Sequence, residues 1–150
     1  MKSLIIIGRG GDGIKTVGEM VSECLVEQKY YILGCPKFGP ERRGAVVYYF
    51  IKFSKNPILD RTLNMEADYA VLMEKDFDHM IKNERCIKII PDEKFITSDR
   101  HKLIYYLIGR FIRVTGVIDF ESMKKRIYDK FLNMELIKSL EEGHGEKKER

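Results

Sequence analysis

A glycine-rich turn between a buried strand and an amphipathic helix constrains this sequence more than any other feature. Residues 3–7 form a continuous β-branched run, which predicts a strand buried on both faces of a parallel sheet. From Ile14 to about Gln28, apolar residues recur at helical spacing. Between the two lies Gly8-Arg9-Gly10-Gly11-Asp12-Gly13, which fits G-x-G-x-x-G through Gly8, Gly10 and Gly13. This order predicts an α/β fold that begins with half of a β-α-β unit.

The glycine turn has two interpretations. In the first it binds an anion, because small residues let the backbone approach a phosphate group and the positive end of the following helix attracts it. The candidate binding residues are then Gly8, Gly10, Gly11, Asp12 and Gly13. In the second, the glycines serve only the close packing of the strand against the helix.

The rest of the pattern predicts a single Rossmann-like domain, with a doubly wound sheet and a helical C-terminal region. Further strands are expected at 30–33, stopped by Gly34 and Pro36, and at 45–53, 67–73 and 86–90. Helices are expected at 75–82, beyond 98, up to 131 after a cap at Asp119 or Ser122, and at 133–140. The segment 37–44 is expected to be a surface loop. We place the domain at 1–142 and a flexible charged tail at 143–150.

Composition excludes several classes of protein. A chain of 150 residues with 44% hydrophobic residues is large enough for one core, and no apolar stretch approaches the roughly 20 residues of a membrane helix, so we expect a cytoplasmic protein. The net charge of +4 is too mild and too mixed for a nucleic-acid partner. Cys24, Cys35 and Cys86 are too few for a four-cysteine iron–sulfur cluster, and none of the three histidines has a nucleophile near it in sequence.

The second predicted strand lacks the acidic residue that would hold a nicotinamide ribose, because its end reads Ile32-Leu33-Gly34-Cys35. Basic residues follow instead, at Lys37, Arg42 and Arg43, where guanidinium groups would suit phosphates. Classical NAD binding is therefore disfavoured, and a phosphate-rich ligand fits better than a bare ribose. The alternative is a pair of solvated arginines that form a salt bridge with Glu41.

The sequence Phe38-Gly39-Pro40-Glu41-Arg42-Arg43-Gly44-Ala45, placed after the glycine turn, resembles the gamma subunit of 2-oxoacid:ferredoxin oxidoreductases, the pyruvate synthase group. The resemblance implies oxidative decarboxylation of a 2-oxoacid to acyl-coenzyme A, with electrons passed to ferredoxin. It places thiamine diphosphate, Mg and iron–sulfur clusters on alpha, beta and delta partners, and no catalytic or metal-binding residue on this chain. Coenzyme A binding would fall to the turn at Gly10 to Gly13 and to Arg42 and Arg43.

Two positions depart from that family. Asp12 stands where many relatives have Gln, and an acid beside a phosphate would repel it unless the side chain points away or caps the helix at Ile14. Val46 stands where a proline is usual. The expected function is a gamma subunit of the pyruvate type that positions coenzyme A. The alternatives are a purely structural subunit of the same complex and a stand-alone nucleotide-binding oxidoreductase.

Overall fold

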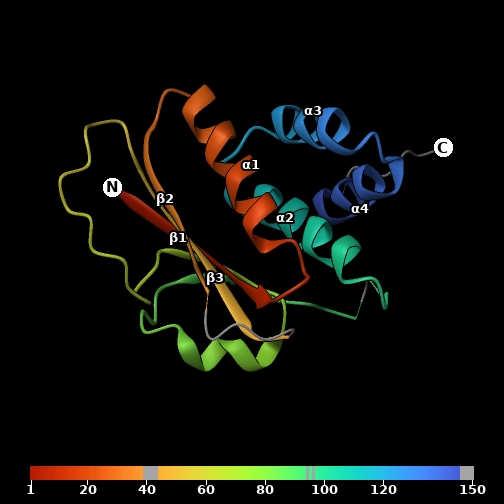
Figure 1. Ribbon diagram of the computed structural model, residues 1–150, viewed down its shortest axis with the longest axis horizontal. Helices are drawn as coiled ribbons and strands as arrows, with labels where there is room; N and C mark the ends of the chain where they lie inside the picture. The colour runs from red at the N-terminus through yellow and green to blue at the C-terminus, as the bar shows by residue number, and fades with distance from the viewer. Residues whose placement is uncertain (39–43, 94, 96, 146–150) are drawn as a thin grey trace.

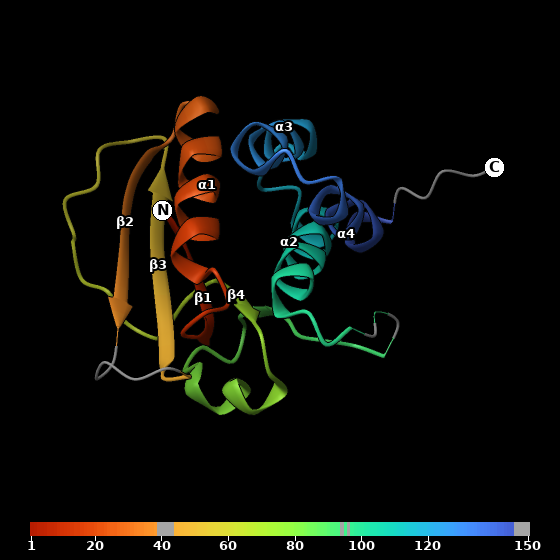
Figure 2. The ribbon, with the colours of Figure 1, turned by 45° about the vertical axis from the view of Figure 1, so that its right-hand side comes forward.

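A five-stranded sheet with four α-helices gathered on one side forms the body of the chain (Figures 1 and 2). The computed structural model describes residues 1–38, 44–93, 95 and 97–145. The elements run in the order β1 Lys2–Arg9, α1 Ile14–Glu27, β2 Tyr31–Phe38, β3 Val46–Ser54, β4 Tyr69–Leu72, the 3-10 helix η1 Lys75–Met80, β5 Ile87–Ile89, α2 Arg100–Thr115, α3 Phe120–Phe131 and α4 Met134–His144. The α/β class and the single domain are thus confirmed.

The sheet is mixed rather than parallel, in the order β2-β3-β1-β4-β5. β1 is parallel to β4, and β4 to β5, but β3 runs antiparallel to both of its neighbours, β1 and β2. The expectation of an all-parallel sheet was therefore wrong for β3. β1 and β2 are parallel to each other but separated by β3, which returns from β2 as a hairpin and inserts beside β1. An apolar run does not reveal strand direction, because burial on both faces is the same in either direction.

The two faces of the sheet are covered differently. On one face, Gly18 of α1 lies directly against the ring of Tyr49 on β3, and α2 covers β4 and β5. On the other face, Tyr48 and Phe50 of the same strand line a pocket with Met80 of η1. The α-helices that the structure describes thus lie on one side, which differs from the helices on both faces of a doubly wound sheet.

β2 continues past the residues that were expected to stop it. Gly34 pairs with Ile51 and Pro36 pairs with Tyr49, so the strand extends to Phe38. Because β2 is the edge strand, one side of it has no neighbour in the sheet, and a proline without an N–H group is tolerated there. The predicted end at Leu33 was wrong for this reason.

The C-terminal boundary lies beyond the expected position. α4 continues to His144, and Gly143 is buried against the backbone of α2 around Tyr106. The helix therefore includes two residues that were assigned to the tail, while 146–150 lie outside the described residues. Within the part of the chain that the structure describes, no helix combines the length and the apolar character needed to cross a membrane.

Candidate phosphate-binding edge

The glycine turn follows β1 at its carboxyl end, as predicted. Its glycines are required for different structural reasons. Gly11 has φ +96° and Gly13 has φ +86°, a region that side chains rarely occupy. Gly8 is needed for packing, because a Cβ there would lie 2.7 Å from Ile14 Cγ1. The packing interpretation thus explains Gly8, whereas the backbone shape explains Gly11 and Gly13.

Some amides of the turn are already paired. Gly10 N–H donates to the Ala45 carbonyl at 2.8 Å, and Asp12 N–H donates to the Arg9 carbonyl at 3.0 Å. The start of α1 is different: its N-cap is Gly13, no side chain caps it, and its first turn contains no acidic residue. The first amides of the helix are therefore the groups that could receive an anion.

Asp12 neither caps α1 nor faces the solvent. Its side chain is 3% exposed and accepts hydrogen bonds from Arg9 N–H at 2.8 Å and from Arg100 Nε at 2.7 Å. Arg100 Nη2 also contacts Glu74 at 3.0 Å, and Glu74 pairs with Arg9 Nε at 2.6 Å. Two carboxylates and two guanidinium groups thus form one neutral cluster, which we call the four-charge cluster. Within this described part of the chain, no unpaired acid lies beside the turn, where it would repel a phosphate.

The four-charge cluster joins the glycine turn to two distant elements, Glu74 beyond β4 and Arg100 at the start of α2. Hydrogen bonding to Arg9 holds the pKa of Glu74 below its usual value, and hydrogen bonding to Asp12 raises the pKa of Arg100. Sequence analysis missed both residues. Arg100 is 88 positions from Asp12, and no local pattern marks such a pair.

The hairpin of β2 and β3 brings the end of β2 and the start of β3 to the same edge of the sheet. Phe38 pairs with Val47 and Arg9 pairs with Val46, so the hairpin turns where β1 ends. Gly44 O accepts a hydrogen bond from Arg9 Nη1 at 3.1 Å. Arg42 and Arg43 lie outside the described residues, but the next residue in the chain is anchored on the glycine turn.

Lys37 points to the other face of the sheet. Its side chain lines a pocket opposite α1, together with Tyr48 and Phe50. The expectation that it lies near the two arginines stays a prediction, because Arg42 and Arg43 lie outside the described residues.

A second feature beside the glycine turn was not predicted. A cavity of about 280 Å³ lies between the starts of α1 and α2 and the α3–α4 connection. Gly13, Thr16 and His101 line it, and the His101 ring would lie 3.5 Å from a Cβ on Gly13. His101 is exposed, and its side chain lines this cavity.

The cysteines do not form a redox or metal site. Cys24 is buried in the core, and Cys35 and Cys86 are separate free thiols. Among the residues described here, no three His, Cys, Asp or Glu side chains come together in a way that could hold a metal ion.

Burial raises the pKa of the Cys86 thiol to about 11. Because the thiolate is the form that attacks, we expect Cys86 to react with iodoacetamide at pH 8 about 100-fold more slowly than the thiol of an unstructured peptide. Peptide mapping by mass spectrometry would measure the rate, with the urea-denatured chain as the control. A peptide-like rate in the folded chain would contradict the assignment.

Several known proteins resemble this chain in sequence and in fold. The family described as pyruvate ferredoxin/flavodoxin oxidoreductase matches residues 3–103. The common gamma subunit of the pyruvate/ketoisovalerate oxidoreductases of Pyrococcus furiosus is 36% identical, over 83% of each chain. The crystal structure of the PORC subunit of Thermotoga maritima pyruvate oxidoreductase has a TM-score of 0.74 at 21% identity and covers 97% of each chain.

A longer protein contains the same fold. It is a 2-oxoglutarate:ferredoxin oxidoreductase from Magnetococcus marinus, solved with 2-oxoglutarate, coenzyme A and succinyl-coenzyme A, and it matches with a TM-score of 0.74 at 14% identity. The match covers 97% of this chain but 30% of that one. The length of the family match and the likeness to the Pyrococcus subunit lead to one conclusion: the chain belongs to the pyruvate ferredoxin/flavodoxin oxidoreductase family, among its gamma-type subunits.

Proposed function

We propose that this chain holds the phosphate-bearing end of coenzyme A within a 2-oxoacid:ferredoxin oxidoreductase of the pyruvate type. One observation carries the proposal: the uncapped start of α1 and the anchored end of the loop that contains Arg42 and Arg43 meet at one edge of the sheet. Coenzyme A has a diphosphate and a 3′-phosphate, so a helix start and two guanidinium groups suit it.

The four-charge cluster supports this assignment. An isolated carboxylate at Asp12 would repel a phosphate, but Asp12 is paired with Arg100 and does not cap the first amides of α1. The cluster also fixes the backbone of the turn through the bond from Arg9 N–H. The turn is thereby held in a shape that does not have to be formed when the ligand binds, and such preorganisation favours affinity.

The proposed role of the chain is positional. In the overall reaction the bond between the carboxylate and the carbonyl carbon of the 2-oxoacid breaks and CO2 leaves. Two electrons go to ferredoxin, the acyl carbon forms a bond to the sulfur of coenzyme A, and the thiol proton is released. Thiamine diphosphate, Mg and the iron–sulfur clusters supply the carbon and electron chemistry, and we propose that alpha, beta and delta partners hold them. Binding energy at the nucleotide end would serve to orient the thiol.

Replacement of Arg42 and Arg43 tests the proposal. We expect R42A/R43A to raise the KM for coenzyme A at least about tenfold in the assembled complex, because two charge-assisted phosphate contacts are lost. The KM for pyruvate should not change. Anaerobic steady-state assays would measure both constants, and R85A/R113A, which removes two exposed arginines elsewhere, is the matched control.

The alternatives give different results in the same assays. An unaltered KM for coenzyme A in R42A/R43A would favour the purely structural subunit. Activity of the isolated chain with a nicotinamide nucleotide would favour the stand-alone oxidoreductase. A higher kcat/KM for a branched or dicarboxylic 2-oxoacid than for pyruvate would overturn the pyruvate assignment and leave the coenzyme A proposal intact.

A further inference from the structure

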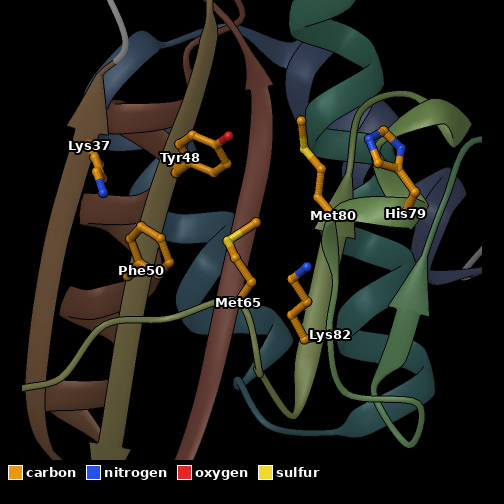
Figure 3. Close-up of a pocket in the computed structure, with 7 residues that line it drawn as sticks. All are labelled: Lys37, Tyr48, Phe50, Met65, His79, Met80 and Lys82. Atoms are coloured by element: carbon orange, nitrogen blue, oxygen red, sulfur yellow. The ribbon is translucent and has the colours of Figure 1, made fainter.

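The face of the sheet opposite the α-helices contains a hollow whose lining includes two lysines and no acidic residue. We call it the basic groove; it has a volume of about 490 Å³ and is lined by Lys37, Tyr48, Phe50, Met65, His79, Met80 and Lys82. Figure 3 shows these side chains in front of the sheet, with α1 and α2 behind it. The groove is thus separated from the glycine turn by its position on the other face.

The floor of the groove is apolar, and neighbouring side chains and strands hold its aromatic residues in place. Tyr48 stacks on Phe50 with ring centroids 5.9 Å apart, and both residues pair with buried isoleucines of β1. Met65 and Met80 complete the floor; their flexible thioether side chains adapt to varied shapes. A partner with apolar side chains could therefore pack here.

Hydrogen bonds from a backbone N–H group and from a side-chain amide hold the wall of the groove in place. Lys82 N–H donates to the Met65 carbonyl at 3.0 Å, and the Asn83 amide donates to the Ala67 carbonyl at 3.1 Å. These bonds hold the segment after η1 against the segment before β4. The basic residue Lys82 and the apolar residue Met65 thus keep their relative positions.

The charge of the groove is not balanced. Lys37, His79 and Lys82 are exposed, and none of the seven lining residues is acidic. Neither lysine forms an ion pair with any carboxylate of the described ranges, whereas Lys88 and Lys52 nearby are paired with Asp78 and Asp60. A ligand with carboxylates would supply the missing charge.

We infer that the basic groove is the docking site for an acidic, partly apolar segment of another subunit of the oxidoreductase complex. The inference rests on the chain working in a multi-subunit complex, but it does not depend on coenzyme A binding. An apolar floor and a cationic rim match a segment with apolar side chains between carboxylates.

Zero-length crosslinking tests the inference in the intact complex. A water-soluble carbodiimide joins a lysine amine to a carboxylate only when the two are in contact. We expect Lys37 or Lys82 to be linked to Asp or Glu of another subunit. In parallel, acetylation of both lysines should be at least about tenfold slower in the complex than in the isolated chain, whereas the exposed Lys130 on α3 should react equally in both.

Charge reversal provides the second arm. K37E/K82E should weaken association with the partner subunits at least about tenfold, because two attractive contacts become repulsive. K125E/K130E, which reverses two exposed lysines on α3, is the matched control, and circular dichroism would confirm that both variants fold. Unchanged association of K37E/K82E would contradict the inference.

The other outcomes are also decisive. If Lys37 and Lys82 are acetylated in the complex as fast as in the isolated chain, the groove is open and the inference is wrong. If they are protected but form no link to a carboxylate, a small molecule or a neutral surface covers them, and the inference is again wrong. If no partner subunit is recovered with the chain, the proposed function fails; if a complex forms with reactive lysines, only this inference fails.

Discussion

Replacement of Gly143 by alanine is expected to destabilise the protein by about 3 kcal/mol, although an alanine normally favours a helix over a glycine by about 1 kcal/mol. A Cβ at Gly143 would lie 2.8 Å from the Tyr106 carbonyl carbon and 3.0 Å from Arg110 N, and closer still to the Tyr106 oxygen. All three atoms belong to the backbone of α2. A side chain can rotate away, but these atoms can move only if the two helices separate.

The same close approach occurs from the other side. A Cβ at Gly109 of α2 would meet the Leu140 carbonyl and His144 N of α4, the latter at 2.8 Å. Two glycines thus allow the two helix backbones to touch. Separation of the helices would open the part of the core around Leu107 and Leu140, both fully buried.

Thermal and urea unfolding would measure the loss in G143A. For a chain of this length, about 3 kcal/mol corresponds to a fall in Tm of roughly 10 °C. K138A, an exposed substitution on the same helix, should change the stability by less than about 0.5 kcal/mol. A gain in stability for G143A would show that helix propensity dominates and that α2 and α4 do not pack as described.

Replacement of Arg100 by methionine has the second large effect, a loss of about 2 kcal/mol. Asp12 is buried, and without Arg100 its carboxylate keeps only the hydrogen bond from Arg9 N–H. The removal of one partner of a buried pair leaves a charge without compensation. The value is below that of a fully buried pair because the Arg100 side chain is 40% exposed and water screens it.

Urea unfolding of R100M, of D12N and of the double variant would measure the coupling between the two residues. If the pair interacts as described, the double variant should be more stable than the sum of the two losses predicts. R113M, at the exposed end of the same helix, is the control and should change little. Additive losses would contradict the direct pairing of Asp12 with Arg100.

Local patterns were sufficient to predict most of the elements. Residues 3–7 and the periodic segment from Ile14 gave the correct strand and helix, because burial and helical spacing are visible within a short window. The direction of β3 and the length of β2 were not visible there. They depend on which strand lies beside which, and this is a property of the whole sheet.

The candidate phosphate-binding edge was predicted only in part, because only some of its residues belong to a local sequence pattern. The glycine turn has a local signature, and the structure places it at the end of β1 as expected. Arg100, which neutralises Asp12, and Glu74, which pairs with Arg9 and Arg100, reach the turn only through folding. Gly143 shows the opposite case. A glycine near a chain end favours the prediction of a frayed tail, yet the absence of a side chain at Gly143 is what allows the last helix to pack.

The four-charge cluster also limits where the chain can be cut without a loss of contacts. The family match ends at residue 103, three residues after Arg100 and near the start of α2. A fragment cut there would keep Arg100 at a frayed end and lose the helix that holds it, while Cys24 of α1 would lose its contact with Met123 of α3. The region that the family model matches is therefore smaller than the packed unit, whose contacts run from β1 to α4.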